Sequence, residues 1–222
     1  MYRFPWIAKN GSGERRQVLK NTLALLTAFL ASHCIAAPVV SGDYEGLLIG
    51  VDRNGVLTGY FESSTGRGKF SCIFFISGKV SDQRGRVETW FPNNSDAKIV
   101  IQGVLEGTAS DEVPLIRLKL SEDHGGCWNV QHFAPDPATF ALTEQGSWES
   151  IRIVAASKAY FYDDPSNPKP RKAFVVTGNA LRVYEIRGAW ARVEYVGPDN
   201  RRSRGWVLTR DLFSAKSPGT EK

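Results

Sequence analysis

The sequence is poor in the residues that bind metals. Of its 222 residues, only three are cysteine and three are histidine. A zinc site usually needs three or four converging nitrogen, sulfur or oxygen ligands. The strongest grouping combines two histidines with two aspartates: Asp123, His124, His132 and Asp136. Because His124 lies in a glycine-rich turn, we expect it to be a solvated loop residue, and we predict no bound metal.

Motifs of catalytic and cofactor sites are also missing. The sequence has no glycine-rich phosphate loop, no serine nucleophile elbow and no dinucleotide-binding fingerprint. Cys72 precedes His124 by 52 positions, a spacing loosely like that of a nucleophile and its base. However, Cys72 lies in an apolar run without a following helix that would lower the thiol pKa. The paired carboxylates at 111–112 and 122–123 lie in polar turns, where nothing raises their pKa values. We predict no enzyme, no catalytic residue and no cofactor.

The longest apolar run of the leader region is too short to span a membrane comfortably. It covers Leu23–Ala31, follows a basic stretch and ends shortly before the small residues of Cys34–Ala37. This order of basic, apolar and small residues is typical of a secretory signal peptide. We predict a signal peptide at residues 1–36, a periplasmic or secreted protein, and no stable membrane insertion after cleavage. The alternative is an uncleaved membrane anchor.

The basic stretch leaves the export route open. Arg15–Lys20 resembles a twin-arginine export signal, although Glu14 stands where that pattern prefers serine or threonine. Two adjacent arginines are also common in ordinary leaders. The sequence therefore does not decide between the general secretory route and the twin-arginine route.

The charge of the chain depends on the leader. The whole sequence has a formal net charge of +5, but residues 1–36 carry five basic and one acidic side chain, which leaves +1 for the rest. We therefore do not expect nucleic acid as a partner. Residues 38–147 hold nine basic and fourteen acidic side chains, whereas residues 148–213 hold twelve and seven. Opposite charges favour docking of the two halves, although chance and solubility explain the same asymmetry.

Two cysteines remain once the leader is removed, Cys72 and Cys127. In an oxidising compartment an isolated pair usually forms a disulfide. A loop of about 55 residues closed in this way stabilises a fold by roughly 4 kcal/mol. We predict this disulfide; a reactive thiol is the alternative.

The region from 38 to 147 alternates short β-rich runs with turn residues and shows almost no helical periodicity. Asp52–Gly55 contains an Asn-Gly pair that favours a tight hairpin, with both central residues at positive φ. Phe70–Ile76 is apolar at nearly every position, which predicts a strand buried on both faces. We predict an all-β fold with an antiparallel barrel or sandwich here. Its eight expected strands are Tyr44–Val51, Val56–Ser63, Phe70–Ser77, Arg86–Phe91, Lys98–Val104, Val113–Leu120, Cys127–Phe133 and Thr139–Thr143.

A second unit is expected from Trp148 to residue 213, after a boundary at Gly146–Ser147, with a disordered tail at 214–222. Four segments of this unit carry a family pattern: Ala159–Ser166, Arg171–Gly178, Gly188–Tyr195 and Gly205–Leu212. In this order, with a Gly-x-Trp opening and a closing Gly-Trp-Val, they resemble the bacterial SH3 (SH3b) family of exported proteins. The resemblance implies a small SH3-like β-barrel that binds cell-envelope material.

Side-chain alternation in Trp190–Val196 supports a strand. One parity holds Ala191, Val193 and Tyr195, so we expect Trp190, Arg192 and Glu194 on the wet face. A large aromatic residue near the surface is a candidate binding platform. We predict an aromatic groove formed by Tyr160, Tyr162, Trp190 and Trp206. The alternative is that these residues cap a very small core.

The sequence leads to two functional hypotheses of different classes. The first is a non-catalytic binding or accessory protein that recognises peptidoglycan peptides or an envelope protein. The second is an inhibitor or immunity protein against a cell-wall hydrolase, acting through the loop Ser121–Gly126 beside Cys127. A hollow first barrel would favour a third role, small-ligand carriage. The oligomeric state is not predicted.

Overall fold

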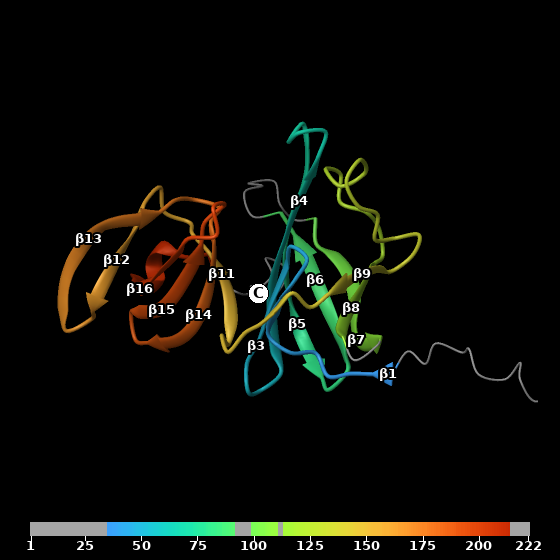
Figure 1. Ribbon diagram of the computed structural model, residues 1–222, viewed down its shortest axis with the longest axis horizontal. Helices are drawn as coiled ribbons and strands as arrows, with labels where there is room; N and C mark the ends of the chain where they lie inside the picture. Colours follow the sequence, from blue (N-terminus) through green and yellow to red (C-terminus); the bar gives the residue numbers. More distant parts are fainter. Residues whose placement is uncertain (1–34, 92–98, 111–112, 214–222) are drawn as a thin grey trace, which may run out of the picture. The chain divides into compact units, whose positions relative to one another are not determined.

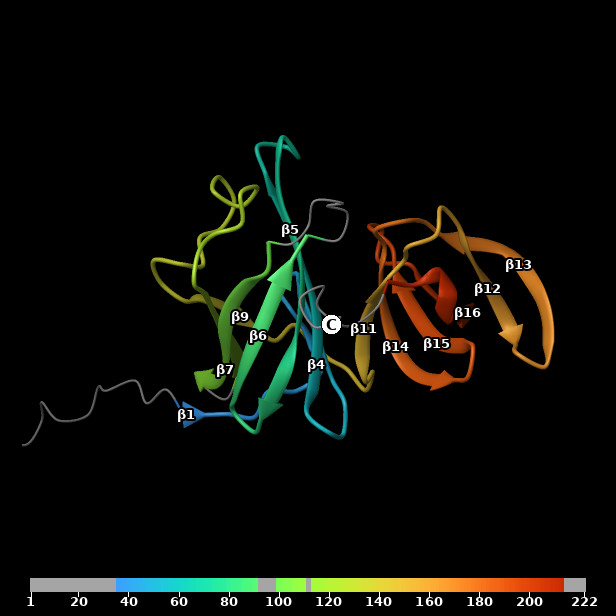
Figure 2. The same ribbon diagram turned by 180° about the vertical axis from the view of Figure 1, so that it is seen from behind.

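The structure, a computed structural model, describes residues 35–91, 99–110 and 113–213. These residues form an all-β protein with two antiparallel sheets and one short 3-10 helix, η1 (Thr209–Asp211) (Figures 1 and 2). In the same residues, no helix has the length and apolar character needed to cross a membrane. Most of the predicted signal peptide, the 111–112 pair and the predicted tail lie outside the described residues.

The first sheet curls on itself and follows the order β10-β2-β3-β4-β5-β6-β7-β8-β9, with β1 paired to β7. Its strands are β1 (Ile35–Ala36), β2 (Gly42–Tyr44), β3 (Leu47–Val51), β4 (Val56–Thr65), β5 (Phe70–Ser81), β6 (Arg84–Trp90), β7 (Ile101–Ser110), β8 (Val113–Leu120), β9 (Ala138–Ala141) and β10 (Glu144–Gln145). The amide of Ala141 donates to the Glu45 carboxylate at 3.1 Å, which links the two ends of the sheet. The predicted antiparallel β architecture is confirmed.

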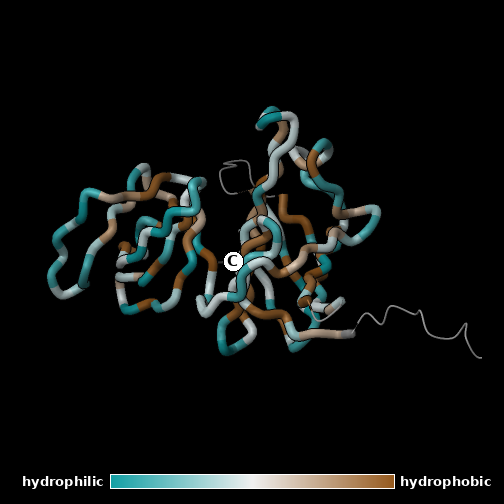
Figure 3. The backbone as a smooth tube through the Cα atoms, in the orientation of Figure 1, coloured by the Kyte–Doolittle hydropathy of each residue, from teal (hydrophilic) through white to brown (hydrophobic). Residues whose placement is uncertain are grey.

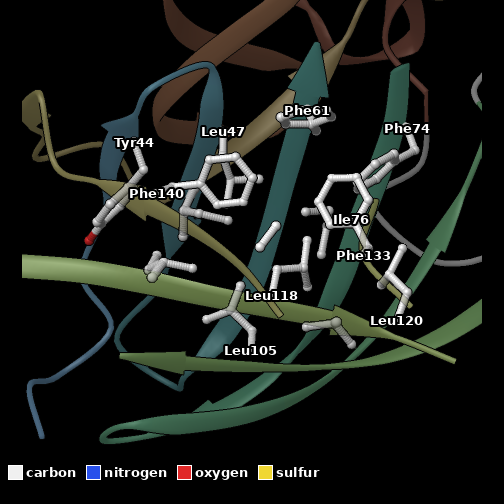
Figure 4. Close-up of a cluster of buried hydrophobic side chains, with 14 of the residues drawn as sticks. Tyr44, Leu47, Phe61, Phe74, Ile76, Leu105, Leu118, Leu120, Phe133 and Phe140 are labelled. Carbon is white, nitrogen blue, oxygen red and sulfur yellow. The ribbon is translucent and has the colours of Figure 1, made fainter. Parts of the chain in front are cut away.

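The inner face of the first sheet is filled by large side chains (Figure 4). The ring of Phe61 lies 5.2 Å from that of Phe74, 5.3 Å from that of Phe133 and 5.6 Å from that of Phe140. All four are buried. The strand predicted at Val113–Leu120 is observed as β8, in which Leu118 and Leu120 point inward while Lys119 is exposed. This interior is a packed core.

The disulfide joins Cys72 of β5 to Cys127, with Cα atoms 4.4 Å apart, as predicted. The strand predicted at Cys127–Phe133 is wrong, because residues 125–130 form turns. The amides of Val130 and Gln131 both donate to the carbonyl of Cys127. Local turns therefore form the hydrogen bonds that these backbone groups would otherwise make to a neighbouring strand. The predicted strand Tyr44–Val51 is also interrupted, where Glu45 and Gly46 adopt positive φ.

The hairpin predicted at Asp52–Gly55 connects β3 and β4, but its geometry differs from the expectation. Among its residues only Gly55 has positive φ, at 75°. The Asp52 carboxylate accepts hydrogen bonds from the amides of Asn54 and Val56, both at 2.8 Å. Asp52 therefore holds this four-residue loop, and only its last residue, Gly55, needs the left-handed conformation.

The second sheet follows the order β11-β14-β15-β16-β12-β13. Its strands are β11 (Ser150–Ile153), β12 (Ala159–Asp164), β13 (Asn167–Val175), β14 (Ala180–Arg187), β15 (Trp190–Val196) and β16 (Arg202–Leu208). The four segments that resemble the SH3b family fall on β12, β13, β15 and β16. Its core contains nine buried residues, mostly small and aliphatic, with Phe161 the one phenylalanine among them. Exposed polar residues run along most of β13 (Figure 3).

The two sheets belong to one compact unit and share a buried apolar junction. The predicted boundary at Gly146–Ser147 lies between β10 of the first sheet and β11 of the second. Trp148 is buried and donates from its indole nitrogen to the carbonyl of Ile49 at 2.8 Å. The amide of Ile151 donates to the Thr58 hydroxyl at 2.7 Å. The apolar members of the junction are Tyr60, Phe75, Trp90, Trp148, Ile151 and Ile153.

This junction explains the predicted double burial of β5. Phe74 and Ile76 point into the first core, whereas Phe75 points to the opposite face and packs in the junction. The prediction is confirmed for the segment Phe74–Ile76. It fails at the start of the strand, where Phe70 is 47% exposed, because the junction does not reach that end.

A buried ion-pair cluster accompanies the apolar junction. Arg182 of β14 donates to Glu194 of β15 at 3.2 Å, to Glu144 of β10 at 3.0 Å and to Asp43 of β2 at 3.3 Å. Glu144 also accepts from Arg202 at 2.8 Å. Acidic residues of the first half thus pair with arginines of the second, as expected from the opposite charges. The expectation that Glu194 lies on a wet face is wrong: it is fully buried, because Arg182 and two further arginines of β16 enclose it.

Candidate binding face of the second sheet

Three of the four residues predicted to form an aromatic groove lie together on one face of the second sheet. The rings of Tyr162 and Trp190 are 4.8 Å apart in an edge-to-face arrangement. Tyr162 is also the cross-strand partner of Trp206 between β12 and β16. Tyr160 packs instead against Phe174, with ring centroids 5.7 Å apart. The structure therefore brings Tyr162, Trp190 and Trp206 together and places Tyr160 in a neighbouring pair.

None of these four aromatic residues belongs to the core of the second sheet, which consists of Val154, Ala159, Phe161, Val175, Leu181, Val183, Ala191, Val193 and Val207. Trp190 and Tyr162 are half-buried. Trp206 is buried, partly because the Arg187 guanidinium lies 5.0 Å from its ring centroid. The alternation of β15 and β16 explains the arrangement, since Ala191, Val193 and Val207 take the inner positions.

A pocket of about 560 Å³ opens beside Trp206. This volume lies within the usual range for small-molecule sites. The pocket is lined by Ser147, Asp163, Arg171, Tyr184, Arg192, Val193, Arg204, Gly205 and Trp206. Sequence reasoning found Trp206 but missed the three arginines. The excess of basic residues in 148–213 was the signal that pointed to them.

The three arginines are held in place by acidic partners. The Nε atom of Arg171 donates to the Asp163 carboxylate at 2.7 Å, and one of its terminal nitrogens donates to the carbonyl of Arg204 at 2.7 Å. Arg204 donates through Nε to Glu194, which raises the pKa of Arg204. Arg192 lies 3.4 Å from the Glu185 carboxylate. The partners orient the guanidinium groups, while Arg192 and Arg204 stay half or more exposed.

The chemistry of this pocket suits an anionic group next to an apolar or aromatic one. A guanidinium group matches the planar, two-oxygen geometry of a carboxylate. Trp206 and Tyr184 provide flat apolar surfaces beside it. Three arginines line the pocket, each of them paired with one carboxylate, and Arg192 and Arg204 keep exposed guanidinium groups. In the described part of the chain, no group of three or more histidine, cysteine, aspartate or glutamate side chains is placed to hold a metal ion.

The loop after β8 differs from its prediction. His124 is 1% exposed, so the expectation of a solvated histidine is wrong. Its ring stacks on Phe74 with centroids 4.8 Å apart, and its Nε2 lies 2.8 Å from the Thr89 hydroxyl. Burial lowers the pKa of His124 to about 4, against a smaller opposing effect of Asp123. The glycine-rich pattern indicated a solvent-exposed turn, but the ring packs against Phe74 and Phe91.

The accessible part of this loop follows the disulfide. Trp128, next to Cys127, is 63% exposed. Asp123 pairs with Nδ1 of His132 at 2.8 Å and accepts hydrogen bonds from two backbone amides. The hydroxyl of Thr65, in the β4–β5 hairpin, donates to the carbonyl of Asn129 at 2.8 Å. Trp128 is thus an outward side chain on a well-anchored loop.

No protein-family model matches this chain, and neither does any curated protein or solved structure compared with it.

Proposed function

We propose that this protein is an exported, non-catalytic binding protein whose second sheet recognises a carboxylate-bearing ligand of the cell envelope, such as a peptidoglycan stem peptide. One observation carries the proposal: Tyr162 and Trp190 are half-buried outside the core of the second sheet, next to the buried Trp206. Aromatic residues that do not fill a core, next to oriented arginines, have the composition of a binding site.

Three further points support this reading. The pocket beside Trp206 combines flat apolar surface with guanidinium groups, which suits a peptide that ends in a carboxylate. The resemblance of residues 148–213 to the SH3b family favours envelope material as the ligand. The disulfide and the predicted leader favour an oxidising compartment.

Isothermal titration of the purified protein with a soluble stem peptide tests the proposal. We expect binding to the peptide with a free C-terminal carboxylate, and about tenfold weaker binding to its C-terminal amide and to Arg192→Gln. Arg210→Gln is the matched control, because Arg210 is exposed on η1 and does not line the pocket. Equal affinity for acid and amide in all three proteins would reject the carboxylate site.

A second candidate function is inhibition of a cell-wall hydrolase through the loop that carries Trp128. The observation that favours it is the 63% exposure of this tryptophan beside the disulfide. Tryptophan is enriched among the residues that dominate protein interfaces. The contact surface would then extend past Cys127 from the predicted loop Ser121–Gly126, in which Asp123 and His124 are engaged internally. The filled interior of the first sheet offers no support for ligand carriage.

A lysozyme inhibition assay at low salt separates this candidate from the first. An inhibitor would lose potency in Trp128→Ala and keep it in Trp190→Ala. A wall-binding protein would show the reverse pattern in the peptide titration. No inhibition by the wild-type protein at micromolar concentration would remove the second candidate.

A further inference from the structure

Arg152 of β11 is a half-buried arginine without an ionic partner among the described residues. Its Nε atom is buried and has no hydrogen-bond partner in the structure. Burial lowers the pKa of Arg152, and no neighbouring carboxylate opposes that effect. Buried charges in proteins are normally paired, because an unpaired one costs free energy. This side chain therefore lacks an acceptor at Nε and a paired carboxylate among the described residues.

One side of Arg152 is apolar. Phe75, Trp90 and Phe213 line a cavity of about 20 Å³ together with Arg152. This volume has room for one water molecule. A water molecule can accept a hydrogen bond from Nε, but it carries no charge and does not neutralise the guanidinium group.

The other side of Arg152 opens into a pocket of 260 Å³. Its apolar lining comes from Val56, Val183 and Ile186. Ser150 and Thr58 add hydroxyl groups to the lining. The pocket is large enough for a small organic acid and combines one guanidinium group with a short apolar wall.

The three carboxylates that line this pocket are already engaged. Asp52 accepts two backbone hydrogen bonds in the β3–β4 hairpin. Glu149 lies 3.6 Å from Arg53. Glu185 pairs with Arg187 at 2.8 Å and with Arg192 at 3.4 Å. Glu149 and Glu185 are thus paired with arginines, and Asp52 is held by backbone amides, so none of the three carboxylates pairs with Arg152.

We propose that the pocket at Arg152 binds a small carboxylate with a short apolar chain, such as butyrate or the C-terminal residue of a peptide. The carboxylate would pair with the Arg152 guanidinium group, and the chain would contact Val56, Val183 and Ile186. This site differs from the pocket beside Trp206 and does not depend on the function proposed for that pocket.

Thermal unfolding with butyrate as the probe tests the site. At about five times the dissociation constant we expect the unfolding midpoint of the wild-type protein to rise by about 2–4 °C. Butyramide, which lacks the charge, and sodium chloride at equal ionic strength should leave it unchanged. Phosphate and a short peptide acid serve as comparison probes. A response to phosphate and not to butyrate would contradict the apolar part of the site, and a response to the peptide acid alone would contradict the free small acid as ligand.

Arg152→Met provides the decisive variant. We expect it to lose the butyrate response and to unfold, in buffer with little salt, at a midpoint equal to or higher than that of the wild-type protein, because the unpaired charge is gone. Arg210→Met and Arg171→Gln should keep the response, and the latter separates this site from the pocket beside Trp206, which Arg171 lines. An equal response in Arg152→Met overturns the proposal. The absence of a response in the wild-type protein at about 100 mM butyrate also overturns it, because any dissociation constant would then lie above the millimolar range.

A second measurement does not depend on the folding of any variant. In the wild-type protein, the nitrogen resonance of the Arg152 side chain should shift on addition of butyrate and not of butyramide. An unchanged resonance at saturating butyrate would place the carboxylate elsewhere and reject the site.

Discussion

The two sheets use their aromatic residues in opposite ways. In the first sheet, Phe61, Phe74, Phe133 and Phe140 point inward and fill the core. The core of the second sheet holds one phenylalanine, and Tyr162, Trp190 and Trp206 are not among its members. The first sheet thus has the composition of a scaffold, whereas the second leaves Tyr162 and Trp190 half-buried at its surface.

The difference extends to how each sheet is stabilised. The first sheet has a large core and a disulfide. The second has nine buried core residues and relies on the junction, where Trp148 and Arg182 are buried. A small core supplies little free energy by itself. We infer that contacts at the junction contribute much of the stability of the second sheet.

Removal of the disulfide should have the largest effect. The double variant Cys72→Ala with Cys127→Ala opens a loop of 55 residues, for which the expected loss is about 4 kcal/mol in the free energy of unfolding. Denaturant unfolding followed by near-ultraviolet circular dichroism measures this loss. A loss below about 1 kcal/mol would mean that the core alone holds the first sheet.

Breaking the buried ion-pair cluster should be the next most damaging change. Arg182→Met removes the ion pairs of Arg182 with Asp43 and Glu144 of the first sheet and takes one of three arginine partners from the fully buried Glu194, and the expected loss is about 3 kcal/mol. The exposed pair of Arg84 with Glu106 supplies the control, because Arg84→Met should cost less than about 0.5 kcal/mol. If both variants lose the same amount, the junction does not hold the second sheet.

Acid should destabilise the first sheet through His124. Its pKa is lowered to about 4 in the folded protein from 6.5, so the unfolded chain binds the proton first as pH falls. The free energy of unfolding that the neutral, buried His124 contributes is fully retained above pH 6.5. It decreases between about pH 6.5 and 4, by no more than about 3 kcal/mol. His124→Asn should flatten this part of the pH profile. A wild-type profile that is flat over this interval would disagree with a buried neutral ring.

Much of the fold could be predicted because its signals are local. Alternation in β15, the apolar run in β5 and the Asn-Gly turn each identified an element, and two cysteines identified one bond. The burial of Glu194 and His124 could not be predicted, because their partners lie on other strands: Arg182 stands opposite Glu194 on β14, and Thr89 lies on β6. The same limit applies to the site: the alternation of β15 indicated Trp190, but the arginines beside Trp206 converge only after the strands pair.

The central claim is that the outward aromatic residues of the second sheet serve binding and not folding, and Trp190→Ala tests it most directly. Denaturant unfolding and titration with the stem peptide should be measured on the same preparation. We predict a loss of less than about 1 kcal/mol in unfolding free energy together with at least about tenfold weaker peptide binding. A loss of several kcal/mol with unchanged affinity of the folded fraction would contradict the claim.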